Sequence, residues 1–116
     1  MSIKLAEKRV NEEIAMRDMY AKTLMRLAEK NGNIVALDAD LMSSMGMMPF
    51  KKAYPDRTFN VGIQEANMIG VAAGMSAVGL IPFAHSFGPF ATRRCFDQIF
   101  LSCGYAKLNV KITGSD

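Results

Sequence analysis

The sequence predicts an α/β fold, a three-layer α/β/α arrangement in which helices cover a mainly parallel sheet. Two observations support this prediction. Segments with apolar residues at helical spacing alternate along the chain with short runs of β-branched and aromatic residues. One run, residues 34–37, is apolar throughout, which is typical of a strand buried on both faces of a parallel sheet. With 116 residues, the chain is long enough for one domain with its own core.

The first quarter of the chain is predicted to be helical. Residues 4–31 form one long helix or two short ones, ended by the sequence Asn-Gly-Asn at 31–33. The apolar residues at helical spacing are Ile14, Met16, Met19, Tyr20, Leu24 and Leu27. The strand at 34–37 then leads into Asp38-Ala39-Asp40, at the carboxyl end where open α/β sheets bind ligands.

The middle of the chain is predicted to supply a second strand and a second long helix. A Met- and Ser-rich connection and a short helix at 49–54 lead through a Pro-Asp turn to a strand at 58–61. The next helix covers roughly 64–78. Gly79 closes it, because glycine readily takes the left-handed conformation that ends many helices.

The last third is predicted to add two strands and another helix. The strand at 80–84 contains Pro82, which cannot donate to a ladder, so this strand lies at a sheet edge or has an unpaired side there. Ser86 is expected to cap a helix that begins one to three residues later. A final strand covers 109–113.

Composition and charge argue against several classes of protein. The formal net charge is +3 with no basic block, which gives no support for nucleic-acid binding. The N-terminus lacks the apolar core of a signal peptide, and the apolar runs are too short to span a bilayer. We therefore expect a cytoplasmic protein that does not enter the membrane.

The cysteines and the single histidine do not form a metal-binding pattern. Cys95 and Cys103 are expected to be core residues of one helix, on which eight residues correspond to about 12 Å of rise, too far for a disulfide. There is no C-x-x-C sequence, so the chain is expected to hold no metal of its own.

Glu65 is the only charged residue in the segment 59–74, at the point where a strand gives way to a helix. Two interpretations stay open from the residues alone. The carboxylate favours the positive end of the helix dipole, or it binds a ligand.

Residues 62–74 read G-I-x-E-x-N-M-x-G-x-A-A-G. Together with Ile81-Pro82-Phe83 and Ser86-Phe87, this pattern resembles the pyrimidine-binding domain of transketolase. From about residue 12 onward, the chain is most similar to the start of the C-terminal section of transketolases encoded as two polypeptides. Deoxyxylulose-phosphate synthase and the β subunits of 2-oxo-acid dehydrogenases share much of the pattern.

The resemblance implies that Glu65 is the catalytic acid and that the cofactor is thiamine diphosphate. In that family the glutamate hydrogen-bonds N1′ of the aminopyrimidine ring and promotes the proton transfer that activates the coenzyme. Phe87 and Phe90 would line the aminopyrimidine pocket, although plain core packing is the alternative for both. The family often has a third aromatic residue where this sequence has Arg93.

The resemblance also implies contacts with cofactor and substrate nearer the N-terminus. Asp40 would lie near the cofactor and a subunit contact, and Ser44 and Arg17 would bind the phosphate of a sugar phosphate. A turn or helix cap is the alternative for Asp40, a solvated loop for Ser44 and a surface charge for Arg17. His85 lies where the family does not usually have histidine; it faces the ligand cleft, or it is a satisfied or solvent-facing side chain.

The activity implied for the complete enzyme is transfer of a two-carbon ketol unit between sugar phosphates, as in the pentose phosphate pathway. The family's diphosphate- and metal-binding G-D-G…N motif is absent from this chain. A partner subunit, the N-terminal section, would supply it and hold Mg²⁺ or Ca²⁺ in a homodimer or heterotetramer. Because the sequence stops after a strand, we expect 1–116 to be a partial pyrimidine-binding domain, incomplete at its C-terminus and inactive alone. The alternatives are a subunit of a deoxyxylulose-phosphate synthase or 2-oxo-acid dehydrogenase, or a non-catalytic interaction module.

Overall fold

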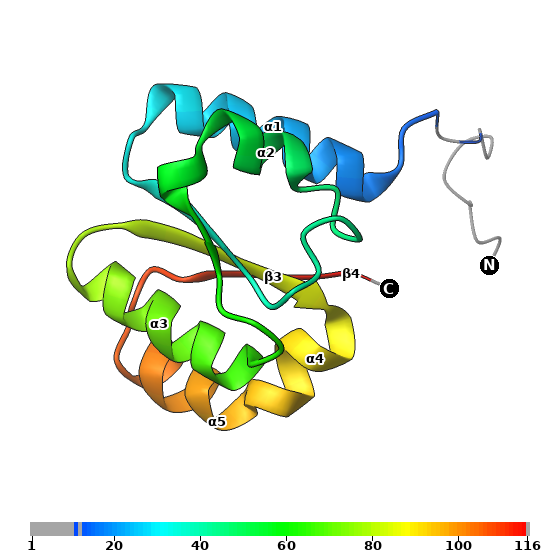
Figure 1. The fold of residues 1–116 in the computed structure, drawn as a ribbon. Helices are drawn as coiled ribbons and strands as arrows, with labels where there is room; N and C mark the ends of the chain where they lie inside the picture. Colours follow the sequence, from blue (N-terminus) through cyan, green and yellow to red (C-terminus); the bar gives the residue numbers. More distant parts are fainter. Residues whose placement is uncertain (1–10, 12, 116) are drawn as a thin grey trace, which may run out of the picture.

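A computed structural model describes residue 11 and residues 13–115 of the chain (Figure 1). Helices and strands alternate, as the sequence predicts. In chain order the regular elements are α1 (Met16–Lys30), β1 (Ile34–Asp38), α2 (Met48–Ala53), β2 (Thr58–Asn60), α3 (Glu65–Ala77), β3 (Ile81–Phe87), α4 (Gly88–Thr92), α5 (Phe96–Gln98) and β4 (Lys111–Ser115). Short 3₁₀ turns at Pro55–Arg57 and Arg93–Cys95 and a π-helical segment at Ile99–Tyr105 complete the described part.

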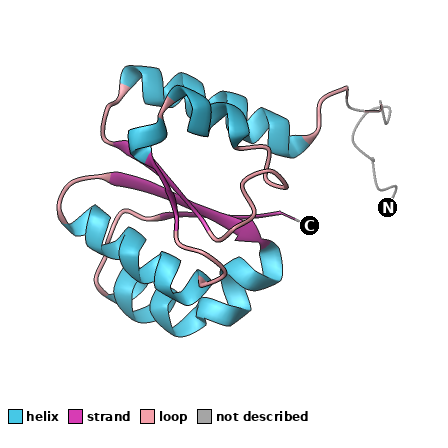
Figure 2. Cartoon of the chain, in the orientation of Figure 1, coloured by secondary structure: helices cyan, strands magenta, loops and turns pink. Residues whose placement is uncertain are grey.

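The four strands form one parallel sheet in the order β2-β1-β3-β4. Helices α1 and α2 cover one face of this sheet, and α3, α4 and α5 cover the other (Figures 1 and 2). The prediction of a three-layer α/β/α fold with a parallel sheet is therefore confirmed. Because all strands run the same way, their carboxyl ends meet at one edge, where ligands bind in folds of this class.

Each face of the sheet has its own apolar core. The core under α1 and α2 is built on alternate residues of β1, Ile34 and Ala36, with Leu24 of α1 and Phe50 of α2. On the opposite side, the buried residues are Val35, Leu37, Ala39, Met68, Ile69, Ala72, Ala73, Ala84, Cys95 and Cys103. All five residues of β1 are buried, as predicted for a strand covered on both faces.

Helix α1 is described from Met16, so the part of the predicted helix at residues 4–10 and at residue 12 lies outside the described residues. The helix ends at Lys30, with Asn31 as its C-cap, as predicted. Its buried face is made by Ala21, Leu24 and Ala28. Several of the larger apolar residues that predict the helix stay exposed, namely Ile14, Met16, Met19 and Leu27.

Strand β3 is longer than predicted and lies inside the sheet. It pairs with β1 on one side and β4 on the other, so the prediction of an edge strand is wrong. The alternative holds, since pairing with β4 begins only at Phe83, one residue after Pro82. The prediction that Ser86 caps the next helix is also wrong: Ser86 belongs to β3, and Phe87 is the N-cap of α4 without a side-chain cap.

The single helix predicted after β3 is broken into four short segments. The chain passes from α4 through a 3₁₀ turn and α5 into a seven-residue π-helix. Cys95 and Cys103 therefore do not share one regular helix, although both are free thiols buried in the core as predicted. The last strand starts two residues later than expected, at Lys111.

Candidate active site

Glu65 is the first residue of α3, and the chain reaches it from the carboxyl end of β2 through a tight turn. Gly62 has a φ of 76° in this turn, a conformation that glycine adopts without strain. The side-chain oxygen of Asn60 accepts a hydrogen bond of 3.0 Å from the backbone N–H of Gly62. This turn places the Glu65 side chain inside the protein, where only 2% of it is exposed.

The Glu65 carboxylate is paired with Arg94, from the 3₁₀ turn between α4 and α5. Nη1 of Arg94 donates to both carboxylate oxygens, at 3.0 and 2.9 Å. The Arg94 guanidinium also lies over the ring of Phe90, 4.0 Å from its centre, which is cation–π geometry. Phe90 and Phe87 are neighbours with ring centres 6.0 Å apart. The structure thus brings together three of the predicted site residues and adds Arg94, which sequence reasoning missed.

Cys95 is packed beside this pair but remains an ordinary core thiol. Burial raises its pKa, the Glu65 carboxylate raises it further, and Arg94 acts in the opposite direction. Its Sγ donates to the backbone oxygens of Ala91 and Phe90 at 3.1 and 3.3 Å. A thiol with a raised pKa is a poor nucleophile, so this residue has a packing role.

Asp40 lies on the loop after β1 and has a positive φ of 65°. Its backbone N–H donates to the side-chain oxygen of Asn60 at 3.0 Å, and its carboxylate accepts from the Asn60 side-chain N–H at 3.1 Å. Asn60 therefore joins the loops that follow β1 and β2. The Asp40 carboxylate thus bonds a side-chain amide of another loop rather than a backbone N–H as a cap would, and its predicted cofactor contact stays a prediction.

Arg17 and Ser44 lie together, while their predicted contact with a phosphate stays a prediction. Nη1 of Arg17 donates to the backbone oxygen of Ser44 at 3.4 Å, and 57% of the Arg17 side chain is exposed. Arg17 also borders a groove of about 480 Å³ at the carboxyl edge of the sheet, with Tyr20, Met45 and Ser115 on its walls. A guanidinium at the rim of an open groove is accessible to an anionic ligand.

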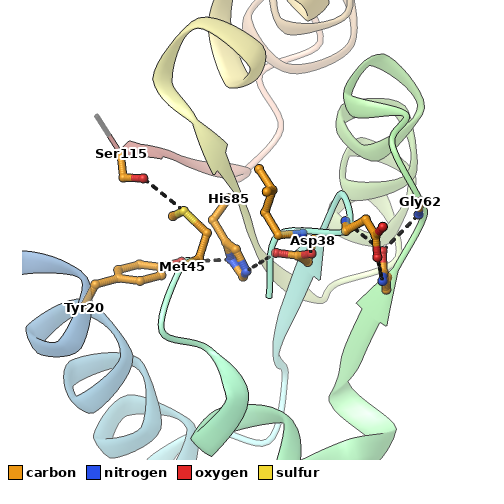
Figure 3. Close-up of polar contacts among 9 residues, drawn as sticks. Tyr20, Asp38, Met45, Gly62, His85 and Ser115 are labelled. Atoms are coloured by element: carbon orange, nitrogen blue, oxygen red, sulfur yellow. Dashed lines mark hydrogen bonds and ion pairs between the residues drawn. The ribbon is translucent and has the colours of Figure 1, made fainter. Parts of the chain in front are cut away.

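His85 is fully buried and lies between Asp38 and Tyr20 (Figure 3). Its Nε2 is 3.2 Å from Oδ2 of Asp38, and its Nδ1 is 3.4 Å from the hydroxyl of Tyr20. The other Asp38 oxygen accepts a 2.6 Å hydrogen bond from the backbone N–H of Leu41. Burial raises the pKa of Tyr20 to about 12; the Asp38 charge adds to the rise, and a hydrogen bond with Thr113 opposes it.

The structure rules out a solvent-facing His85, because its side chain is fully buried; its Nε2 lies 3.2 Å from Oδ2 of Asp38 but makes no hydrogen bond there. Sequence reasoning missed its partners, because Tyr20 is 65 positions away along the chain. The only signal available was that two polar residues, Asp38 and His85, stand at the ends of neighbouring buried strands.

The described residues contain no group of three or more His, Cys, Asp or Glu side chains placed to hold a metal ion. No helix within the described part of the chain is long and apolar enough to cross a membrane.

The pair formed by Glu65 and Phe90 fits the aminopyrimidine ring of thiamine diphosphate. The carboxylate accepts N–H hydrogen bonds from a planar cation, and the Phe90 face supports that same planar group. A pyrimidine ring with a protonated nitrogen offers both features, a planar face and a charged N–H donor. The acceptor and the aromatic group that would orient such a ring are therefore present.

The fold and this site define an α/β domain that presents a buried acid and an aromatic ring at the carboxyl edge of a parallel sheet. The family model described as the transketolase pyrimidine-binding domain matches residues 12–116. The chain therefore belongs to that family, as its sequence motifs predict.

Individual relatives agree with this assignment. The chain is 54% identical over 105 residues to the 6-deoxy-6-sulfo-D-fructose transketolase subunit SqwH of Clostridium sp. (strain MSTE9), covering 90% of this chain and 33% of the relative. It is 47% identical over 100 residues to a putative transketolase C-terminal section of Methanocaldococcus jannaschii, covering 86% and 32%. A 1-deoxy-D-xylulose-5-phosphate synthase of Thermomicrobium roseum is 39% identical over 94 residues, covering 81% and 15%.

A solved structure also resembles this one. A split-gene transketolase, described as an inactive β4 tetramer, superposes with a TM-score of 0.76 at 52% identity, covering 84% of this chain and 32% of that one. The chain thus spans about a third of the length of SqwH, of the C-terminal section and of the split-gene structure.

Proposed function

We propose that this chain contributes the activating glutamate and the aminopyrimidine pocket to a thiamine-diphosphate-dependent transketolase. The observation that carries the proposal is the buried carboxylate of Glu65, fixed at the start of α3 and facing a cation that lies on the Phe90 ring. A buried acid that can exchange a proton with a bound group is what this chemistry requires.

When bound, thiamine diphosphate supplies the carbanion chemistry by which a two-carbon ketol unit moves between sugars. The residues of this chain bind and orient the coenzyme. Glu65 accepts a hydrogen bond from the pyrimidine N1′ position and exchanges a proton there, while Phe87 and Phe90 hold the ring plane. The dry surroundings of Glu65 exclude water from this proton transfer.

Arg17 and Ser44 are proposed to bind the anionic end of the sugar. Arg17 is exposed at the rim of the groove beside the carboxyl edge of the sheet, and it donates a hydrogen bond to the backbone oxygen of Ser44. A guanidinium binds phosphate or sulfonate with its planar set of donors. Because the relative SqwH is named for a sulfonated sugar, substrate assays should include both sugar phosphates and sulfonated sugars.

The remaining components are proposed to come from a second subunit. We propose that a diphosphate-binding N-terminal section holds the diphosphate and its Mg²⁺ or Ca²⁺, with Asp40 near the contact, in a cytoplasmic homodimer or heterotetramer. The chain alone, as a partial pyrimidine-binding domain, would then be inactive. The proposal is supported by the share of the relatives that the chain covers, about a third.

The decisive experiment replaces Glu65 in an assembly reconstituted with the diphosphate-binding subunit. We expect Glu65→Gln to lower turnover by about 100-fold or more, since general acid–base catalysis contributes about 10²–10⁴-fold. Circular dichroism checks that the fold is retained. Glu29→Gln, at an exposed position of α1, is the matched control and should leave turnover unchanged. Unchanged turnover in Glu65→Gln would refute the proposal.

A substrate screen on the same assembly separates transketolase from the synthase alternative, which the relative from Thermomicrobium roseum raises. A transketolase requires a ketose donor. A 1-deoxy-D-xylulose-5-phosphate synthase would instead form its product from a 2-oxo acid.

A further inference from the structure

We propose that Arg94 occupies the place of the aminopyrimidine ring in the cofactor-free protein and is displaced when the coenzyme binds. This inference rests on the proposed function of Glu65, and it assigns a role to a residue that the sequence motifs do not mark.

The first support is the chemical likeness between the guanidinium and a protonated pyrimidine. Both are planar, both carry positive charge and both donate N–H hydrogen bonds. Arg94 makes the two contacts that the proposed function assigns to the ring: its Nη1 donates to the Glu65 carboxylate, and its Cζ lies over the Phe90 ring. A ring bound at the same carboxylate and the same aromatic face would therefore meet the Arg94 guanidinium.

The second support is the need of Glu65 for a partner. Its side chain is 2% exposed, and a buried carboxylate without a partner is strongly destabilising. Both of its oxygens accept from one nitrogen of Arg94. The arginine thus stabilises the acid while no coenzyme is present.

The third support is the difference in burial between the two partners. The Arg94 side chain is 45% exposed, whereas Glu65 is enclosed at the start of α3. A half-exposed arginine can move into solvent, where its guanidinium becomes fully hydrated, while the buried carboxylate cannot follow. The exchange therefore leaves Glu65 in position and transfers its oxygens from the guanidinium to the ring.

Displacement of Arg94 must lower the apparent affinity for the coenzyme, because the ion pair has to break first. Removing the guanidinium should consequently tighten coenzyme binding and, at the same time, destabilise the cofactor-free protein. The substitution would thus strengthen coenzyme binding while it weakens the stability of the cofactor-free protein. A purely structural role for Arg94 would lower stability without tightening binding.

The test uses the assembly reconstituted with the diphosphate-binding subunit and titrates thiamine diphosphate in excess Mg²⁺ by calorimetry. For Arg94→Met we expect the Kd to fall about three- to tenfold, in line with the modest strength of a partly exposed ion pair. The Tm of the cofactor-free assembly should fall as well. Arg94→Lys keeps the charge on a shorter, non-planar group, so it should change the Kd and the Tm less. It replaces Arg94→Met in the test if Arg94→Met does not fold.

Arg93→Met is the matched control, because it removes the same charge from an exposed neighbouring position. We expect its Kd to stay within about twofold of the parent or to rise, since a positive charge near an anionic ligand favours binding. Equal tightening in both variants would overturn the inference. An unchanged or raised Kd in Arg94→Met would overturn it too, because Arg94 would then not compete with the ring.

Glu65→Gln separates failure of this inference from failure of the proposed function. If Glu65→Gln abolishes turnover and Arg94→Met does not tighten binding, only the inference fails. If Glu65→Gln changes neither turnover nor Kd, Glu65 does not meet the coenzyme and the proposed function fails. The inference further requires that Arg94→Met has a smaller effect on Kd when Glu65 is already glutamine.

Discussion

Two buried acids illustrate how partners decide the behaviour of a single residue. Glu65 is paired with an arginine that is nearly half exposed, so its partner is exchangeable. Asp38 is enclosed by the buried ring of His85 and by the backbone N–H of Leu41. The first arrangement suits a residue that changes partners during a reaction, and the second suits one that fixes the loop after β1.

The buried phenol of Tyr20 predicts a specific dependence of stability on pH. Its pKa is raised from 10.0 to about 12, so folding favours the neutral phenol. The resulting stabilisation is complete below about pH 10, the ordinary tyrosine pKa, and is lost as the pH rises toward about 12. Tyr20→Phe should remove this component, which corresponds to a slope of about 1.4 kcal/mol per pH unit.

Urea denaturation at several pH values between 9 and about 12 measures this slope. Tyr105→Phe is the control, because Tyr105 is 80% exposed and its removal should leave the pH dependence unchanged. If the parent and Tyr20→Phe lose stability equally steeply above pH 10, the phenol does not titrate as described.

At the scale of elements, the crossing of α4 over β4 depends on two glycines. A Cβ built on Gly114 would lie 2.7 Å from the Cα of Gly88, the first residue of α4. Backbone approaches backbone there, so no side-chain rotation can relieve the contact. The close approach positions the start of α4, and with it Phe90, next to the carboxyl edge of the sheet.

Gly114→Ala is therefore expected to destabilise the chain by about 1–3 kcal/mol, the usual cost of overpacking. Gly74→Ala should change stability in the opposite direction, since an added Cβ at Gly74 meets nothing within 4 Å. Alanine in the interior of α3 should stabilise by about 0.5–1 kcal/mol relative to glycine. Chemical denaturation measures the free energy of unfolding of both variants. A Gly114→Ala protein as stable as the parent would show that α4 and β4 are not held this closely.

At the scale of the whole molecule, two separate cores share one central pair of strands. Residues of β1 and β3 point alternately into the core under α1 and the core under α3. A loss of packing on either face is thus transmitted through the same strands.

We expect Leu24→Ala on one face and Met68→Ala on the other to cost about 2–5 kcal/mol each. Leu24 is 1% exposed and Met68 fully buried. Because the sheet is common to both cores, each variant should still unfold in one transition, with circular dichroism and tyrosine fluorescence coinciding. Two separate transitions would mean that the faces are independent. Leu27→Ala, at a position 42% exposed, is the control and should change stability much less.

Much of this architecture was predictable because it depends on local patterns. The continuous apolar run of β1 predicted its burial, and the boundaries of α3 were within one residue of the expected 64–78. Predictions were wrong where distant contacts override local preference. Ser86 is a good helix cap by type, yet pairing with β4 extends β3 through Phe87.

The sequence by itself determined the family to which the chain belongs, and it marked the residues that we propose carry the chemistry: Glu65 in its motif and the aromatic pair Phe87 and Phe90. Only the tertiary structure decided the partners of these residues, Arg94 for Glu65 and Asp38 and Tyr20 for His85. The physical reason is that residue spacing along the chain indicates only on which face of its own helix or strand a residue lies. Ion pairs and hydrogen bonds between residues 29 to 65 positions apart depend on how the sheet and its covering helices pack.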